Sequence, residues 1–94
     1  MPAVTVSVQN NIFTPEIASV NVGGTVTWNW TASDHTVTSV LSPAFNANTG
    51  VQNAGFTLGP LTFNTLGTFA YICTVHGSVS GNSTSGMAGT VVVQ

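Results

Sequence analysis

Residues 25–30 read Thr-Val-Thr-Trp-Asn-Trp, and this stretch decides the fold class of the chain. Val26, Trp28 and Trp30 alternate with polar residues, which places the apolar side chains on one face of an extended strand. β-Branched and aromatic residues are the types that strands favour. The same period of two recurs in four further runs, which are Val4–Val8, His35–Ser39, Phe69–Cys73 and Thr90–Val93.

Turn residues punctuate these runs. Gly23-Gly24 separates Val20–Val22 from the stretch quoted above, and Gly59-Pro60 separates Phe56–Leu58 from Leu61–Phe63. No stretch has the spacing of an amphipathic helix. The sequence therefore predicts one all-β domain over residues 1–94, an antiparallel Greek-key β-sandwich or barrel of seven to eight strands.

Two segments have weak strand character. Residues 42–53 carry many Asn, Ala and Gly, and we expect a long loop there with room for one helical turn. Residues 77–86 are almost wholly Gly, Ser, Thr and Asn, which predicts a second loop.

The charge balance excludes several functions. The 94 residues include two acidic side chains, Glu16 and Asp34, and no Lys or Arg. Without basic residues there is no phosphate-binding patch, so we expect no nucleic-acid partner and no polybasic membrane anchor. No run reaches the ~18 apolar residues that would span a bilayer. Residues 1–8 lack the pattern of a secretory signal, so we expect no signal peptide in this chain.

Few side chains can carry chemistry. We expect Cys73 to end a strand and His76 to follow three positions later, after a turn, so a thiolate and an imidazole could reach one metal ion across the strand end. A Cys–His nucleophile pair and an inert buried thiol are the alternatives. Taken alone, Met87 fits a core gap-filler and His35 a hydrogen-bonded core histidine.

These four residues gain weight together. The chain has two His, one Cys and, apart from the start residue Met1, one Met. Cys73, His76 and Met87 follow one another near the C-terminal end, and His35 begins a strand. Two imidazoles, a thiolate and a weak thioether are the ligand types of an electron-transfer copper site.

At this point the sequence resembles the cupredoxins, the small blue copper proteins of the plastocyanin, amicyanin and azurin group. The resemblance covers most of the chain. Its motifs are Phe13-Thr14-Pro15, Val20-Asn21-Val22-Gly23-Gly24-Thr25-Val26-Thr27-Trp28, His35-Thr36-Val37, the series Phe63, Gly67, Phe69, Tyr71, Cys73 and His76, and Met87-Ala88-Gly89-Thr90-Val91. The resemblance implies a single type 1 copper ion held by His35, Cys73 and His76, with Met87 as the axial ligand.

The sequence departs from the family pattern at two points. Thr36 stands where family members often have an Asn that joins the two ligand loops by hydrogen bonds, and we expect the threonine to make fewer of them. Ten residues, Gly77–Gly86, separate His76 from Met87, whereas the family usually has a shorter spacing.

The resemblance implies a one-electron carrier rather than an enzyme, in a periplasmic or extracellular location. We expect the protein to be a monomer. We expect His35 to be buried and His76 to lie at the solvent edge, where redox partner proteins would dock. Val37 and Val75 would keep the site dry, and Trp28 and Trp30 would be core residues rather than electron relays. The alternatives are a non-metal structural or adhesive β-sandwich module and a type 1 copper domain taken from a larger protein.

Overall fold

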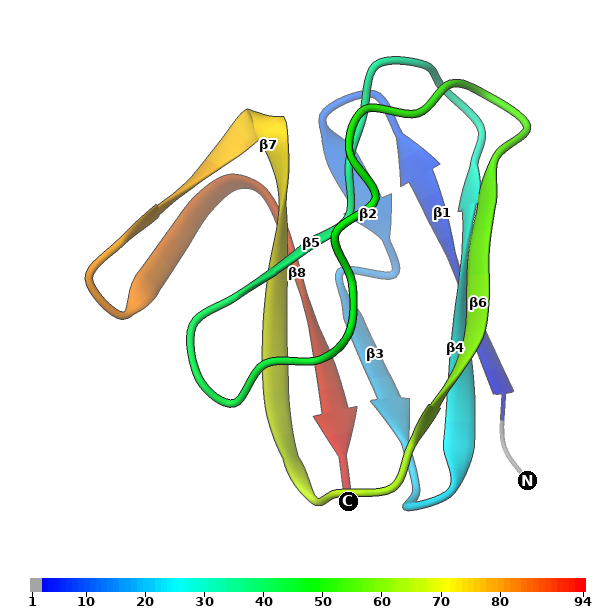
Figure 1. Ribbon diagram of the computed structural model, residues 1–94, viewed down its shortest axis with the longest axis vertical. Helices are drawn as coiled ribbons and strands as arrows, with labels where there is room; N and C mark the ends of the chain where they lie inside the picture. The colour runs from blue at the N-terminus through cyan, green and yellow to red at the C-terminus, as the bar shows by residue number, and fades with distance from the viewer. Residues whose placement is uncertain (1–2) are drawn as a thin grey trace.

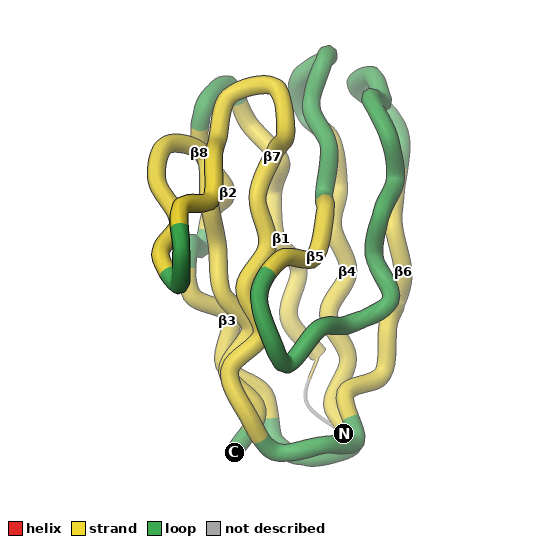
Figure 2. The backbone as a smooth tube through the Cα atoms, turned by 60° about the vertical axis from the view of Figure 1, so that its left-hand side comes forward, coloured by secondary structure: helices red, strands yellow, loops and turns green. Residues whose placement is uncertain are grey.

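The computed structural model describes residues 3–94, which fold into two four-stranded sheets packed face to face (Figures 1 and 2). The first sheet has the order β2-β1-β4-β6, with bounds β2 (Ile12–Thr14), β1 (Ala3–Gln9), β4 (Gly24–Trp30) and β6 (Thr57–Phe63). The second has the order β3-β8-β7-β5, with bounds β3 (Ile17–Val20), β8 (Ser83–Val93), β7 (Gly67–Ser80) and β5 (Thr38–Val40). The expected all-β sandwich of eight strands is confirmed.

Every connection from β2 to β7 crosses between the sheets, as a Greek-key sandwich requires. Four of the six pairs among the named strands are antiparallel as expected, and two are parallel, namely β1 with β4 and β3 with β8. The period of two gives the face that a strand buries and not the direction of its neighbour. The second sheet continues beyond the body as a β7–β8 ribbon, which bends away at one side of Figure 1.

The core forms where the alternating faces of the two sheets meet. Trp28 and Tyr71 are fully buried, and their rings meet edge to face with centroids 5.5 Å apart. Trp30 is 3% exposed, so both tryptophans are core residues as expected. Complete burial of one large apolar side chain contributes about 1.5–3 kcal/mol, so this layer supplies much of the fold's stability. The other core members include Val6, Val8, Phe13, Val26, Phe63, Phe69, Val91 and Val93.

The expected break at Gly59-Pro60 is absent, because β6 runs unbroken from Thr57 to Phe63. The register shifts opposite Val26 and Trp28, so the two residues are accommodated as a bulge within the strand. Pro60 has no N–H to donate, and β6 is an edge strand where such a loss is tolerated. Gly59 has φ +105°, and a Cβ there would lie 2.8 Å from the carbonyl oxygen of Val26.

Residues 42–53 form the expected long loop, but it contains no helical turn. Two isolated bridges tie it down instead, from Asn48 to Thr38 and from Gln52 to His35. Phe45 stacks on Trp28 with ring centroids 5.7 Å apart, so the loop closes one side of the core. Among residues 3–94, no helix is long and apolar enough to cross a membrane.

The expected loop at residues 77–86 is the largest correction to the sequence prediction. β7 continues to Ser80 and β8 begins at Ser83, so this segment is the end of a hairpin in which Gly77 pairs with Gly86. Cys73 therefore lies inside a strand and not at its end. A segment rich in Ser and Thr shows no apolar alternation, so the pattern gives no strand signal. It still forms strands here because Thr favours an extended backbone and because strands pair through main-chain hydrogen bonds.

Candidate metal centre

His35, Cys73 and His76 come together at the end of the sandwich where the long loops lie. Their candidate ligand atoms all lie within 4.8 Å of one another. The Nδ1 atoms of His35 and His76 are each 3.7 Å from Cys73 Sγ, and the two ring centroids are 4.9 Å apart. Two imidazole nitrogens thus converge on one sulfur.

His35 is fixed by its backbone and is 1% exposed, as expected for the buried imidazole. Its N–H and C=O both pair with the main chain of Gln52, at 3.3 and 3.0 Å. The indole Nε1–H of Trp30 donates to the His35 carbonyl oxygen at 2.9 Å, a bond that is itself buried. The loop after β4 is thereby held against both the core and the long loop.

Cys73 and His76 are presented by an irregularity in β7. The ladder with β8 is regular up to the pair Ile72 and Ala88 and resumes at Gly77 and Gly86. Residues 73–76 of β7 consequently stand opposite Met87 alone. Such a bulge redirects side chains out of the normal alternation, which is how residues three positions apart reach the same point. Cys73 is fully buried. His76 is exposed, as expected for the ligand at the solvent edge.

The same bulge explains the long spacing before Met87. Because Gly77 pairs with Gly86, the residues between them leave the site and return to it as a closed ribbon. Met87 is 1% exposed and faces the bulge in the ladder. A Cβ on Gly77 would collide with the carbonyl oxygen of Met87 and lie 3.0 Å from that of Cys73, so the two strands approach closely here.

Thr36 makes more hydrogen bonds than we expected of it. Its hydroxyl accepts the N–H of Thr74 at 2.9 Å and lies within hydrogen-bond distance of the hydroxyls of Thr74 and Thr38. Its own N–H donates to Cys73 Sγ at 3.4 Å. Thr36 therefore joins the His35 loop to the Cys73 strand, so the expectation of a weaker link is wrong. The Thr36 side chain is short, but the two segments are close enough for its hydroxyl to form these hydrogen bonds.

The surroundings of the site are apolar on one side and open on the other. Burial lowers the pKa of His35 below its usual value, and nearby His76 adds to this lowering while Asp34 opposes it. The lowered pKa favours the neutral ring, which is the form that can bind a metal. Val37 is fully buried as expected, but Val75 is 50% exposed and does not shield the site. Its position in the outward-turned bulge accounts for the difference.

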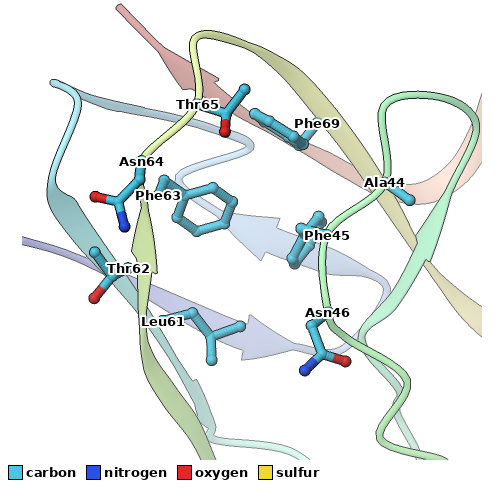
Figure 3. A pocket seen from close by; sticks show the side chains of 9 residues that line it. All are labelled: Ala44, Phe45, Asn46, Leu61, Thr62, Phe63, Asn64, Thr65 and Phe69. Atoms are coloured by element: carbon cyan, nitrogen blue, oxygen red, sulfur yellow. The ribbon is translucent and has the colours of Figure 1, made fainter.

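The site is distinct from a hollow elsewhere in the surface. That hollow has a volume of about 380 Å³ and lies between β6 and the long loop (Figure 3). Phe45, Phe63 and Phe69 form its apolar floor, with Asn46 and Asn64 among the polar residues at its rim. None of the four candidate ligands lines it.

Comparisons with known proteins bear on the sequence and the fold of the chain. No protein-family model matches the chain. Halocyanin from Natronomonas pharaonis is 36% identical over 85 residues, which are 87% of this chain and 48% of halocyanin. The chain thus spans about half the length of the curated relative that it matches. The solved structures that match nearly the whole chain include a reduced amicyanin variant and a purple cupredoxin from Nitrosopumilus maritimus.

The amicyanin variant is 26% identical with a TM-score of 0.67, covering 98% of this chain and 82% of amicyanin. The purple cupredoxin is 20% identical with a TM-score of 0.71, covering 97% of this chain and 99% of its own. The sandwich and the grouping of Cys, His and Met at one end define a cupredoxin-type domain. The chain therefore has the fold of the cupredoxins and is similar in sequence to halocyanin.

Proposed function

We propose that this chain binds one copper ion through His35, Cys73, His76 and Met87 and carries single electrons. The observation that carries the proposal is the approach of two imidazole Nδ1 atoms to one thiol sulfur at 3.7 Å each. Copper, when bound, would supply a one-electron couple between Cu(I) and Cu(II).

The donor set suits copper better than the other common metals. A thiolate and a thioether are soft donors that favour Cu(I), and imidazole serves both oxidation states. A structural zinc site would usually have four strong ligands, whereas a thioether is a weak one. Among residues 3–94 the site contains no carboxylate within ligand distance, which disfavours calcium and magnesium.

Each residue would have its own task in this function. Cys73, inside the core, would hold the metal as a thiolate, and His35 would hold it from the buried side. His76 is exposed, so its ring would be the route by which electrons enter and leave. The Gln52 bridge and the Thr36 bonds would keep these groups in one arrangement in both oxidation states, so that little moves when an electron is transferred.

The proposed partners are redox proteins that dock around His76. A chain with two acidic groups and no basic ones produces a weak field, so electrostatic steering should be small. Docking would then depend on the apolar and hydroxyl-bearing surface near His76. We also propose a carrier role without catalysis, a monomeric state, a periplasmic or extracellular location, and residues 1–94 as a single cupredoxin domain.

Adding Cu(II) to the metal-free protein tests the proposal. We expect intense visible absorption from the thiolate and an endpoint at one copper per chain. Cys73→Ser should abolish the colour and keep the β-sheet circular dichroism, while Ser78→Ala on the exposed ribbon should change neither. A colourless wild-type protein would contradict the proposal and favour the structural or adhesive module. Colour that survives in Cys73→Ser would show that the ligands are elsewhere.

A further inference from the structure

The ring of His35 has a second polar contact on the side away from Cys73. Its Nε2 atom lies 3.2 Å from Oδ1 of Asn10. Asn10 belongs to the two-residue turn between β1 and β2, where Gln9 pairs with Ile12. Asn11, the other turn residue, has φ 63°, a left-handed conformation that asparagine tolerates well. The turn thus delivers an amide to the edge of the proposed metal centre.

The chemistry of this contact determines where the ring carries its proton. A neutral imidazole has one N–H, on either Nδ1 or Nε2. An amide oxygen only accepts hydrogen bonds, so a bond to Asn10 Oδ1 requires the proton on Nε2. The lone pair then resides on Nδ1, the nitrogen that faces Cys73 Sγ at 3.7 Å. We propose that Asn10 is a positioning residue that fixes the Nε2–H tautomer of His35 and turns its Nδ1 lone pair toward the metal.

In the part of the chain that the structure describes, the other polar groups around His35 do not hydrogen-bond to its ring Nε2. Trp30 bonds to the carbonyl oxygen of His35 and Gln52 to its main chain, and neither touches the ring nitrogens. Among residues 3–94, no other side chain is within hydrogen-bond distance of Nε2. The ring is almost completely buried whereas Asn10 is exposed, so a surface residue controls a buried ligand.

The inference deepens the proposed copper function and rests on it for the use of the Nδ1 lone pair. Loss of an outer partner of a metal-binding histidine typically costs about 10–100-fold in metal affinity. Because Asn10 is exposed, water can partly replace its amide oxygen in a truncated variant. We therefore expect Asn10→Ala to lower copper affinity about tenfold, the small end of that range. Asn10→Asp keeps an oxygen acceptor and should retain the affinity.

The metal-free protein provides a test that does not depend on copper. Nitrogen-15 NMR of the ring at about pH 8, where a histidine is neutral, reports which nitrogen carries the proton. We expect the Nε2–H form for His35 in the wild type and in Asn10→Asp, and a mixture of tautomers in Asn10→Ala. Asn11→Gly is the matched control, because it alters the same turn and keeps Asn10. It should leave both the tautomer and the copper affinity unchanged.

The outcomes separate this inference from the proposed function. An Nδ1–H wild-type ring, or an Asn10→Ala ring with the wild-type pattern, would overturn the role of Asn10. Equal losses in Asn10→Ala and Asn11→Gly would also overturn it, because the turn itself would then be responsible. A tautomer that follows Asn10 in a protein that gives no colour with Cu(II) would support the positioning and contradict the copper function.

Discussion

The two halves of the β7–β8 ladder differ although they belong to one hairpin. In the lower half, which lies on the sandwich side of the bulge, Phe69 and Tyr71 alternate with outward residues. Here β5 and β3 flank the β7–β8 pair on either side. In the upper half, which is the ribbon beyond the bulge, residues 77–80 and 83–86 pair only with each other, and their side chains are mostly exposed. The proposed metal centre lies at the boundary, where residues 73–76 oppose Met87.

The difference shows which forces act in each half. Apolar burial holds the lower half, because one face of each strand enters the core. The upper half has main-chain pairing and a few hydroxyl bonds, such as that between Ser78 and Ser85 at 2.9 Å. The bulge lies between the two halves. It interrupts the regular alternation of side-chain directions at Cys73 and His76. Changes at the boundary should therefore affect the site more than changes in either half.

Gly77→Ala should have the largest effect, because it acts at the boundary itself. The new Cβ would meet backbone atoms of Met87 and Cys73, which cannot move aside without shifting a strand. We expect a loss of about 1–3 kcal/mol in the free energy of unfolding, together with weakened copper binding. Denaturant unfolding and copper titration would measure both.

Gly81→Ala is the control for that substitution. Gly81 lies at the tip of the ribbon with φ +60°, and a Cβ there has no neighbour within 4 Å. It should cost about 1–2 kcal/mol of left-handed strain and leave copper affinity unchanged. Equal copper affinities in the two variants would contradict the role given to the bulge.

Tyr71→Phe probes the buried lower half through its pH dependence. Burial raises the pKa of Tyr71 from 10.0 to about 12, so the folded state favours the protonated phenol. This contribution is complete below pH 10 and disappears as the pH rises through 12, a loss of about 2–3 kcal/mol. Between pH 10 and 12 the free energy of unfolding should fall with pH in the wild type. It should fall less steeply in the variant.

At neutral pH the same variant should be as stable as the wild type or more so. The Tyr71 hydroxyl is buried without a hydrogen-bond partner among residues 3–94, so its removal forfeits no bond. A clear loss of stability at pH 7 would show that the hydroxyl has a partner, such as a bound water.

Met87→Leu tests the residue that stands opposite the bulge. Leu has a similar volume, so the fold should lose less than about 1.5 kcal/mol. If the thioether is a weak axial ligand, the variant should still bind copper and stay coloured, with a raised reduction potential. Voltammetry and the visible spectrum would show this. An unchanged potential and spectrum would mean that Met87 is a core residue only.

Shortening the ribbon should have the smallest effect. Residues 78–85 can be replaced by a two-residue Asn-Gly turn between Gly77 and Gly86, a pairing that suits such a turn. We expect copper affinity to stay within about twofold, the range of an ordinary surface change. A larger loss would show that the upper half supports the site directly.

Much of this structure was predictable from the sequence, and the exceptions have physical causes. Period-two alternation identified the strands of the buried lower half, such as Phe69–Cys73, because one face must enter the core. It could not find the ribbon at 77–86, where neither face is buried. The ligand candidates were identifiable because the chain has a single Cys, Cys73, and a single Met besides Met1, which is Met87. Asn10 gave no such signal, since its contact with His35 spans 25 positions and depends on the tertiary fold.

X-ray absorption of the copper-loaded protein tests the central claim most directly, namely that the bulge in β7 brings Cys73 and His76 together with His35 around one metal ion. The account predicts one copper per chain with one short bond to sulfur and two bonds to imidazole nitrogen. In Cys73→Ser the short sulfur bond should vanish. A copper environment of nitrogen and oxygen alone in the wild type would contradict the account.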